Sequence, residues 1–284
     1  AILIVVLAVI HGLDRLVTIG QDLGIVPDLA ESMPEVSADG RVYTFHLRKD
    51  AKFHDGKPVT AHDFKWSIER AADPLNGSPV VDQYLGDIVG VKERLAADAT
   101  EVNGVRAIDD YTLEITIDAP KTYFIAKLTY PSAFVLDREN VETGRRWSRT
   151  PNGTGPFKLA EYVSGESLTL SANENYHLGR PSLESVRFLL SGGTGMLMYE
   201  NDEIHITGVG VADLDRVLDP TNSLNNQLQK SPPSFSTDYI GMNVDRPPFK
   251  GDPKLRQALN YAIDKNVIAR DVLAGLVVPA AGIL

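Results

Sequence analysis

Two short glycine-rich stretches have the residue types and spacing that could bind a phosphate group. They are residues 151–157, Pro-Asn-Gly-Thr-Gly-Pro-Phe, and residues 192–195, Gly-Gly-Thr-Gly. A phosphate loop also needs a following Lys-Ser or Lys-Thr pair and the N-terminus of a helix. Neither stretch is followed by that pair, and the prolines of residues 151–157 prevent a helix from starting there. We therefore expect residues 151–157, called the joint segment below, to be a rigid connection.

Histidine and acidic residues alternate closely in residues 46–63, as a metal site would require. However, His46, His54 and His62 are expected in a strand, a turn and a helix, respectively. Helix capping explains the presence of Asp63, and a turn explains the residues that follow His54. The remaining histidines are isolated in the sequence: His11, His177 and His205. We expect no metal ion and no other cofactor.

Catalytic patterns are weak in this sequence. A serine nucleophile usually occupies a Gly-x-Ser-x-Gly turn, which the sequence lacks. Glycoside hydrolysis needs two facing carboxylates, and none of the 38 acidic residues stands out as such a pair. We expect a protein that is not an enzyme, with a secreted hydrolase that uses a carboxylate pair as the alternative.

Charge and composition restrict the partners and the covalent chemistry. The sequence has 38 acidic and 28 basic residues, a net charge of −10, which disfavours binding to nucleic acid and to anionic membranes. The absence of cysteine excludes disulfides and thiolate metal sites. Residues 1–10 are apolar but have only about half the length of a membrane-spanning helix. Their β-branched side chains favour a buried strand or the start of a helix over a targeting segment.

Periodic and capped segments must position these residues. Residues 41–49 and 111–117 alternate between apolar and polar side chains, which predicts half-buried strands. Thr60 and Asp63 predict a capping box at the start of a helix that runs to about Ala72. Further strands are expected at residues 157–163, 167–171, 186–190 and 236–244, and further helices at residues 122–130 and after Asp252 and Asp264. Because strands and helices do not alternate regularly, the fold class is α/β of the mixed α+β kind.

Several longer motifs, read together, resemble the family 5 extracellular solute-binding proteins of ABC importers, which are peptide-, dipeptide- and nickel-binding receptors. The motifs follow one another in the family's order over roughly residues 16–280. They are residues 43–48 (YTFHLR), 53–63 (FHDGKPVTAHD), 153–157 (GTGPF), 175–181 (NYHLGRP) and 241–264, which include GMNV, PPF and LRQALNYAID.

This resemblance implies a two-lobed fold of the periplasmic-binding-protein type II, whose lobes close over a solute. The base of lobe I would comprise residues 1–45 and 151–236, and residues 46–150 would form an inserted subdomain. Residues 237–284 would form the crossover and the beginning of lobe II. Family members are considerably longer, so the resemblance implies that only the first lobe and the start of the second are present.

The implied function is that of an extracytoplasmic receptor, periplasmic or extracellular, that delivers a solute to an ABC permease in the membrane. The solute would be peptide-like, with a metal chelate or a sugar as other options. We expect a monomer that binds no nucleic acid. A truncated interaction module without a transport role is a further alternative.

The candidate ligand contacts lie near the expected crossing between the lobes. A structural role would explain each of these residues equally well. They are of three kinds: polar side chains, accessible backbone groups, and cationic groups for an anion. In that order they are Tyr239 and Asn243, Thr154 and Gly155, and Arg146 and Arg149.

Overall fold

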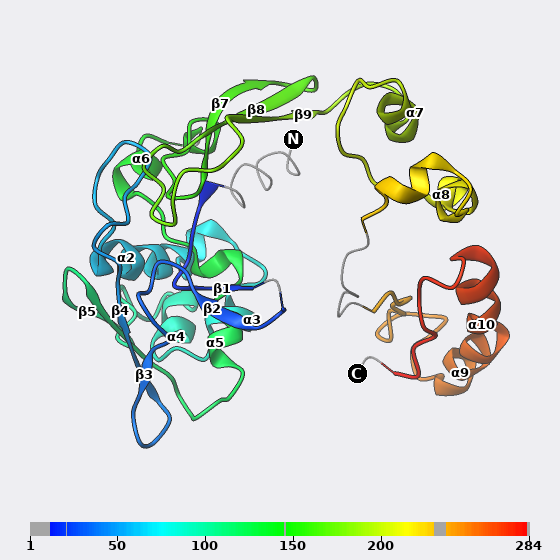
Figure 1. Ribbon diagram of the computed structural model, residues 1–284. Helices are drawn as coiled ribbons and strands as arrows, with labels where there is room; N and C mark the ends of the chain where they lie inside the picture. The colour runs from blue at the N-terminus through cyan, green and yellow to red at the C-terminus, as the bar shows by residue number, and fades with distance from the viewer. Residues whose placement is uncertain (1–11, 21, 145, 230–236, 283–284) are drawn as a thin grey trace. The chain divides into compact units, whose positions relative to one another are not determined.

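A computed structural model describes residues 12–20, 22–144, 146–229 and 237–282 (Figure 1). The chain divides into two compact units, residues 1–191 (unit 1) and residues 192–284 (unit 2). The strand or helix start expected at residues 1–10 lies outside the described residues. None of the helices in the described part of the chain is long and apolar enough to cross a membrane.

The main sheet of unit 1 is antiparallel and confirms two strands expected from alternation. Its strand order is β3 (Glu35–Val36), β4 (Val42–His46), β6 (Thr112–Thr116) and β5 (Val105–Asp109). Phe45 lies opposite Leu113, and both side chains are fully buried. The boundary expected between the base of lobe I and its inserted subdomain, residues 45/46, falls inside β4, and this division remains a prediction.

Helix α2 (Ala61–Ala71) has the expected capping box and the expected end. The Thr60 hydroxyl accepts the N–H of Asp63, and the Asp63 carboxylate accepts the N–H of Thr60 at 2.9 Å. The buried face of α2 includes Phe64 and Ile68, and the helix packs on β5 and β6. The helix therefore closes one face of the main sheet.

Shorter elements complete the core of unit 1, which extends from Leu16 to Val135. Strands β1 and β2 pair in an antiparallel ribbon. These elements are β1 (Val17–Ile19), β2 (Ile25–Pro27), α3 (Val81–Leu85), α4 (Val91–Leu95), α5 (Phe124–Lys127) and α6 (Arg138–Glu142), with 3-10 turns at Pro74–Asn76, Pro131–Ala133 and Trp147–Arg149. The helix expected at residues 122–130 is thus present but shorter.

A three-stranded sheet follows the joint segment (Figure 1). The hairpin expected there is confirmed, with strand order β7 (Phe157–Val163), β8 (Ser167–Ala172) and β9 (Ser185–Leu189). Leu168 and Leu170 on β8 form a small core of their own.

Unit 2 is helical in its described residues. Asp252 caps α9 as expected, because its carboxylate accepts the N–H of Leu255 at 2.9 Å. The strand expected at residues 236–244 is wrong for residues 237–243, which have no regular structure, while residue 236 lies outside the described part. The elements of unit 2 are α7 (Gly195–Glu200), α8 (Leu214–Leu218), α9 (Pro253–Ala262) and α10 (Lys265–Val267), with 3-10 turns at Val211–Asp213 and Ser223–Gln227 and a π turn at Ile268–Val272. A strand needs a ladder partner, and every described strand belongs to unit 1.

Candidate functional site

The joint segment is attached through its backbone to the first described residues of the chain. The N–H groups of Thr154 and Gly155 both donate to the carbonyl of Gly12, at 2.8 and 3.1 Å. In return, the N–H of Asp14 donates to the Thr154 hydroxyl at 2.9 Å. The Thr154 side chain is buried, with 1% of the residue exposed. These bonds join two segments that are distant in the sequence.

Gly153 permits this close approach because it has no side chain. A Cβ atom at this position would lie 1.7 Å from the Gly12 carbonyl oxygen, which is far inside contact distance. The Gly153 carbonyl accepts the N–H of His54 at 2.7 Å. The joint segment is thus held between two other segments, in agreement with a rigid connection.

The His54 ring completes the contact and is neutral. Its Nδ1 accepts the N–H of Gly153 at 3.3 Å, so the proton is on Nε2, which donates to the Gly155 carbonyl at 3.1 Å. Burial of the ring lowers the pKa of His54 to about 4. Because both ring nitrogens have partners within the chain, His54 has a structural role here, as expected from the sequence.

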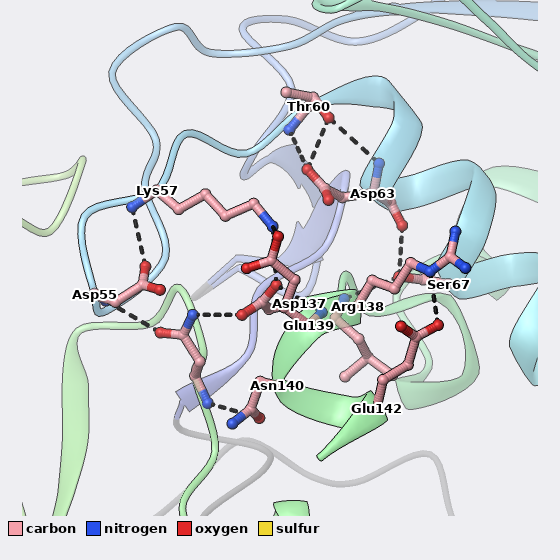
Figure 2. A network of polar contacts seen from close by, with 12 residues as sticks. Asp55, Lys57, Thr60, Asp63, Ser67, Asp137, Arg138, Glu139, Asn140 and Glu142 are labelled. Atoms are coloured by element: carbon pink, nitrogen blue, oxygen red, sulfur yellow. Dashed lines mark hydrogen bonds and ion pairs between the residues drawn. The ribbon is translucent and has the colours of Figure 1, made fainter. Parts of the chain in front are cut away.

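A buried carboxylate holds the other side of the joint segment (Figure 2). Asp137 accepts hydrogen bonds from Lys57 Nζ at 3.1 Å and from Asn152 Nδ2 at 2.7 Å. Asn152 also accepts the N–H of Asp55 and donates its own N–H to Asn140, each at 3.1 Å. Burial alone would raise the pKa of Asp137, but the bonds from Asn152 and Lys57 outweigh it and hold the pKa below its usual range.

The candidate ligand contacts are divided between the two units. The Gly155 carbonyl already accepts from His54 and from Asn173 Nδ2, the latter at 3.0 Å, and the Thr154 hydroxyl is engaged as described. In unit 1, Arg146 and Arg149 are exposed at the 3-10 turn before the joint segment. In unit 2, Asn243 is exposed, and Tyr239 is 75% exposed. A ligand role for these six residues remains a prediction.

One histidine that is isolated in the sequence has acidic neighbours in the structure. His177 Nε2 lies 3.6 Å from Asp28 Oδ1, and Asp14 is the third member of the group. Burial and the charge of Asp28 raise the pKa of Asp14 to about 7. No local pattern could have indicated this group, because Asp14 and Asp28 are far from His177 in the sequence. His177 is thus isolated in the sequence but not in the structure.

The sequence matches one protein family over most of its length. A sequence model of the bacterial extracellular solute-binding proteins, family 5 (middle region), matches residues 24–284. The chain therefore belongs to this family, as its motifs indicated.

Individual relatives agree with this assignment. The periplasmic oligopeptide-binding protein OppA of Escherichia coli K12 is 33% identical over 268 residues, which are 90% of this chain and 48% of that protein. The structure of the E. coli murein tripeptide binding protein MppA is 29% identical with a TM-score of 0.82, and the match covers 95% of this chain and 53% of that chain.

A third relative was solved with a peptide. The Haemophilus influenzae OppA complex with RPPGFSPFR is 27% identical with a TM-score of 0.77, over 94% of this chain and 53% of that chain. The chain thus spans about half the length of these relatives. The likeness confirms the expected fold class, the mixed α/β fold of two-lobed periplasmic binding proteins.

Proposed function

We propose that this chain is part of an extracytoplasmic receptor of an ABC importer, which binds a peptide-like solute and delivers it to the membrane permease. The family match over residues 24–284 carries the proposal. Three similar proteins favour a peptide over a sugar or a metal chelate: the E. coli OppA is an oligopeptide-binding protein, MppA is a murein tripeptide binding protein, and the H. influenzae OppA was solved with a nonapeptide. The family groups solute-binding proteins and not enzymes, so we set the hydrolase alternative aside.

In this proposal the solute bridges two lobes and stabilises their closed arrangement, which the permease recognises. Unit 1 supplies one wall, and the joint segment holds Thr154 and Gly155 in a fixed backbone position within that wall. A wall that is ordered before binding costs less conformational entropy when the solute arrives. Arg146 and Arg149 would contact an anionic group of the peptide, and Tyr239 and Asn243 would contact its polar groups.

Calorimetric titration of the natural protein, in parallel with the 284-residue chain, tests the proposal. The titrants are RPPGFSPFR, shorter peptides, a disaccharide and a nickel chelate. We expect saturable binding of peptides by the natural protein, with a negative heat-capacity change, and no binding of the other two. If the natural protein binds no peptide, the receptor proposal is wrong. Stable folding without any peptide binding would instead support the interaction module.

The proposed arginine contacts can be tested separately. The variant with both Arg146→Ala and Arg149→Ala should bind peptides with a free carboxylate roughly 10- to 100-fold more weakly, which is the effect of losing one charge-assisted hydrogen bond. Peptides with an amidated C-terminus should be affected little. Arg180→Ala removes another partly exposed arginine of unit 1 and is the matched control. Equal losses in the two variants would contradict a specific contact.

A further inference from the structure

Three ionisable side chains from distant parts of unit 1 meet in its interior. Asp14 precedes β1, Asp28 directly follows β2, and His177 follows β8. Each residue offers one ligand atom, and these three atoms lie within 4.8 Å of one another. Asp14 is 7% exposed, Asp28 is 5% exposed and the His177 side chain is 1% exposed. We call these residues the buried triad.

Two buried polar atoms of the buried triad make no hydrogen bond. In the described part of the chain, neither Asp14 Oδ2 nor His177 Nε2 has a hydrogen-bond partner, although both are shielded from solvent. An unsatisfied buried polar atom costs about 1–3 kcal/mol, so native proteins rarely keep two of them together. This cost disappears if both atoms bind a common ligand.

The distances suit two ligands of one ion better than a hydrogen bond. The 3.6 Å between His177 Nε2 and Asp28 Oδ1 is longer than a hydrogen bond. Two ligand atoms that each bind a tetrahedral ion at about 2.0–2.2 Å lie roughly 3.3–3.6 Å apart. The distance between these two atoms is therefore already suitable for binding a common cation.

Both aspartates are held in place by other contacts of the chain. Asp28 Oδ2 accepts the N–H of Arg15 at 3.4 Å and lies 3.8 Å from Arg15 Nε. Asp14 is held through its backbone, because its N–H donates to the Thr154 hydroxyl at 2.9 Å. Metal-binding carboxylates are oriented, as Asp28 is, by hydrogen bonds to their second oxygen. Each aspartate is thus held by the chain and keeps an oxygen that can bind an ion.

The charges of the group also favour a cation. Two carboxylates lie beside one guanidinium, so the group has more negative than positive charge when both carboxylates are ionised. We propose that Asp14, Asp28 and His177 bind one divalent transition-metal ion of the Zn²⁺ type, which suits one imidazole and two carboxylate oxygens. The ion would connect the β1–β2 ribbon to the segment after β8. This proposal does not depend on peptide binding.

Zinc retention after refolding is the test, because a buried site is filled most easily while the chain folds. The 284-residue chain is refolded from denaturant with Zn²⁺, dialysed against a weak chelator, and its metal content is measured by elemental analysis. We expect about one equivalent of zinc in the wild type and a loss of most of it in His177→Ala. Refolding with Mg²⁺ should leave no bound magnesium, because imidazole is a poor ligand for that ion.

A second histidine pair provides a matched control. His62 Nε2 also lies 3.6 Å from an aspartate oxygen, Asp110 Oδ1, but the two side chains are 62% and 69% exposed. His62→Ala should retain the full zinc content. If His62→Ala loses zinc as His177→Ala does, the metal is bound at the surface and the proposal is wrong.

Two further variants keep the test decisive if His177→Ala folds poorly. Asp14→Asn preserves the size of the side chain and should abolish retention. Thr154→Val removes the hydroxyl that accepts the backbone N–H of Asp14 and should weaken zinc affinity roughly 10- to 100-fold. A folded wild type that retains no zinc would overturn the proposal.

Discussion

Units 1 and 2 contain helices with similar sequence patterns but very different burial. In unit 1, Phe64 on α2 is fully buried within a continuous core. In unit 2, α9 buries none of its residues, and Tyr261 on this helix is 88% exposed. Among the described residues of unit 2, the buried hydrophobic side chains are Met196, Leu214, Val217 and Ala269.

The difference separates helix formation from helix packing. Both helices begin with a side-chain cap: the Thr60 hydroxyl accepts the N–H of Asp63 in α2, and the Asp252 carboxylate accepts the N–H of Leu255 in α9. Capping residues and the spacing of apolar residues are local properties that can be identified in the sequence. Burial requires a second element that packs on the apolar face, and α9 buries none of its residues. Most of the stability should therefore come from unit 1.

The largest expected effect comes from removing a core side chain in unit 1. Phe64→Ala should lower the free energy of unfolding by about 3–5 kcal/mol, because it leaves a cavity between α2 and the main sheet. Leu259→Ala on α9, where the residue is 38% exposed, should change it by less than about 0.5 kcal/mol. Urea unfolding followed by circular dichroism measures both. Equal effects would show that the two units do not differ as described.

A clash at the joint segment should have the next largest effect. Gly153→Ala places a Cβ against the Gly12 carbonyl and should cost about 1–3 kcal/mol. Gly208→Ala in unit 2 is the control, because its Cβ would meet no atom within 4 Å. Thermal unfolding of the two variants should differ clearly. A neutral Gly153→Ala would contradict the tight contact between these segments.

Acidification should weaken unit 1 through His54. The folded-state pKa of His54, about 4, lies below its ordinary value of 6.5, so the unfolded chain binds the proton more readily. The stabilisation is complete above pH 6.5 and is lost as the pH falls toward 4, by about 2 kcal/mol. The raised pKa of Asp14 has the opposite effect on stability over about the same pH range. This effect is present in all the variants compared, so it does not alter the differences between them.

Comparison of unfolding at pH 7 and pH 4.5 isolates the contribution of His54. His54→Gln should show a smaller loss of stability on acidification than the wild type. The control is His205→Gln in unit 2, which leaves the contacts of the joint segment intact. An unchanged pH dependence in His54→Gln would mean that another group is responsible.

The smallest effect is expected at the helix caps. Thr60→Ala removes one half of the capping box of α2 and should cost about 1 kcal/mol. Asp252→Ala removes the cap of α9 and should leave the main unfolding transition unchanged, since α9 contributes no buried side chain. A shift of this transition by Asp252→Ala would indicate that α9 is packed more closely than described.

Local features were predicted well from the sequence, and distant contacts were not. Alternation around Phe45 and Leu113 predicted two strands, because side chains on one face of a strand recur at every second residue. The prolines and glycines of the joint segment predicted a rigid connection, but not that the carbonyl of Gly12 holds it. His177 could not be matched with Asp14, because neither residue lies in a local pattern that depends on the other.

The same limit applies to residues 236–244. Their composition is typical of a strand, but a strand exists only when another one supplies its hydrogen bonds. For residues 237–243, none of the described elements does so. Composition therefore indicated a preference of this segment and not its conformation.

The attachment of the joint segment to Gly12 has a consequence for the order of events during biosynthesis. The bond between Asp14 and Thr154 closes a separation of 140 residues. At a ribosomal rate of about 5–20 residues per second, the partner of Asp14 is made on the order of ten seconds after Asp14 itself. During that interval the N–H of Asp14 lacks the hydroxyl group that accepts it in the folded chain. The bond between Asp14 and Thr154 can therefore form only after the joint segment has been synthesised.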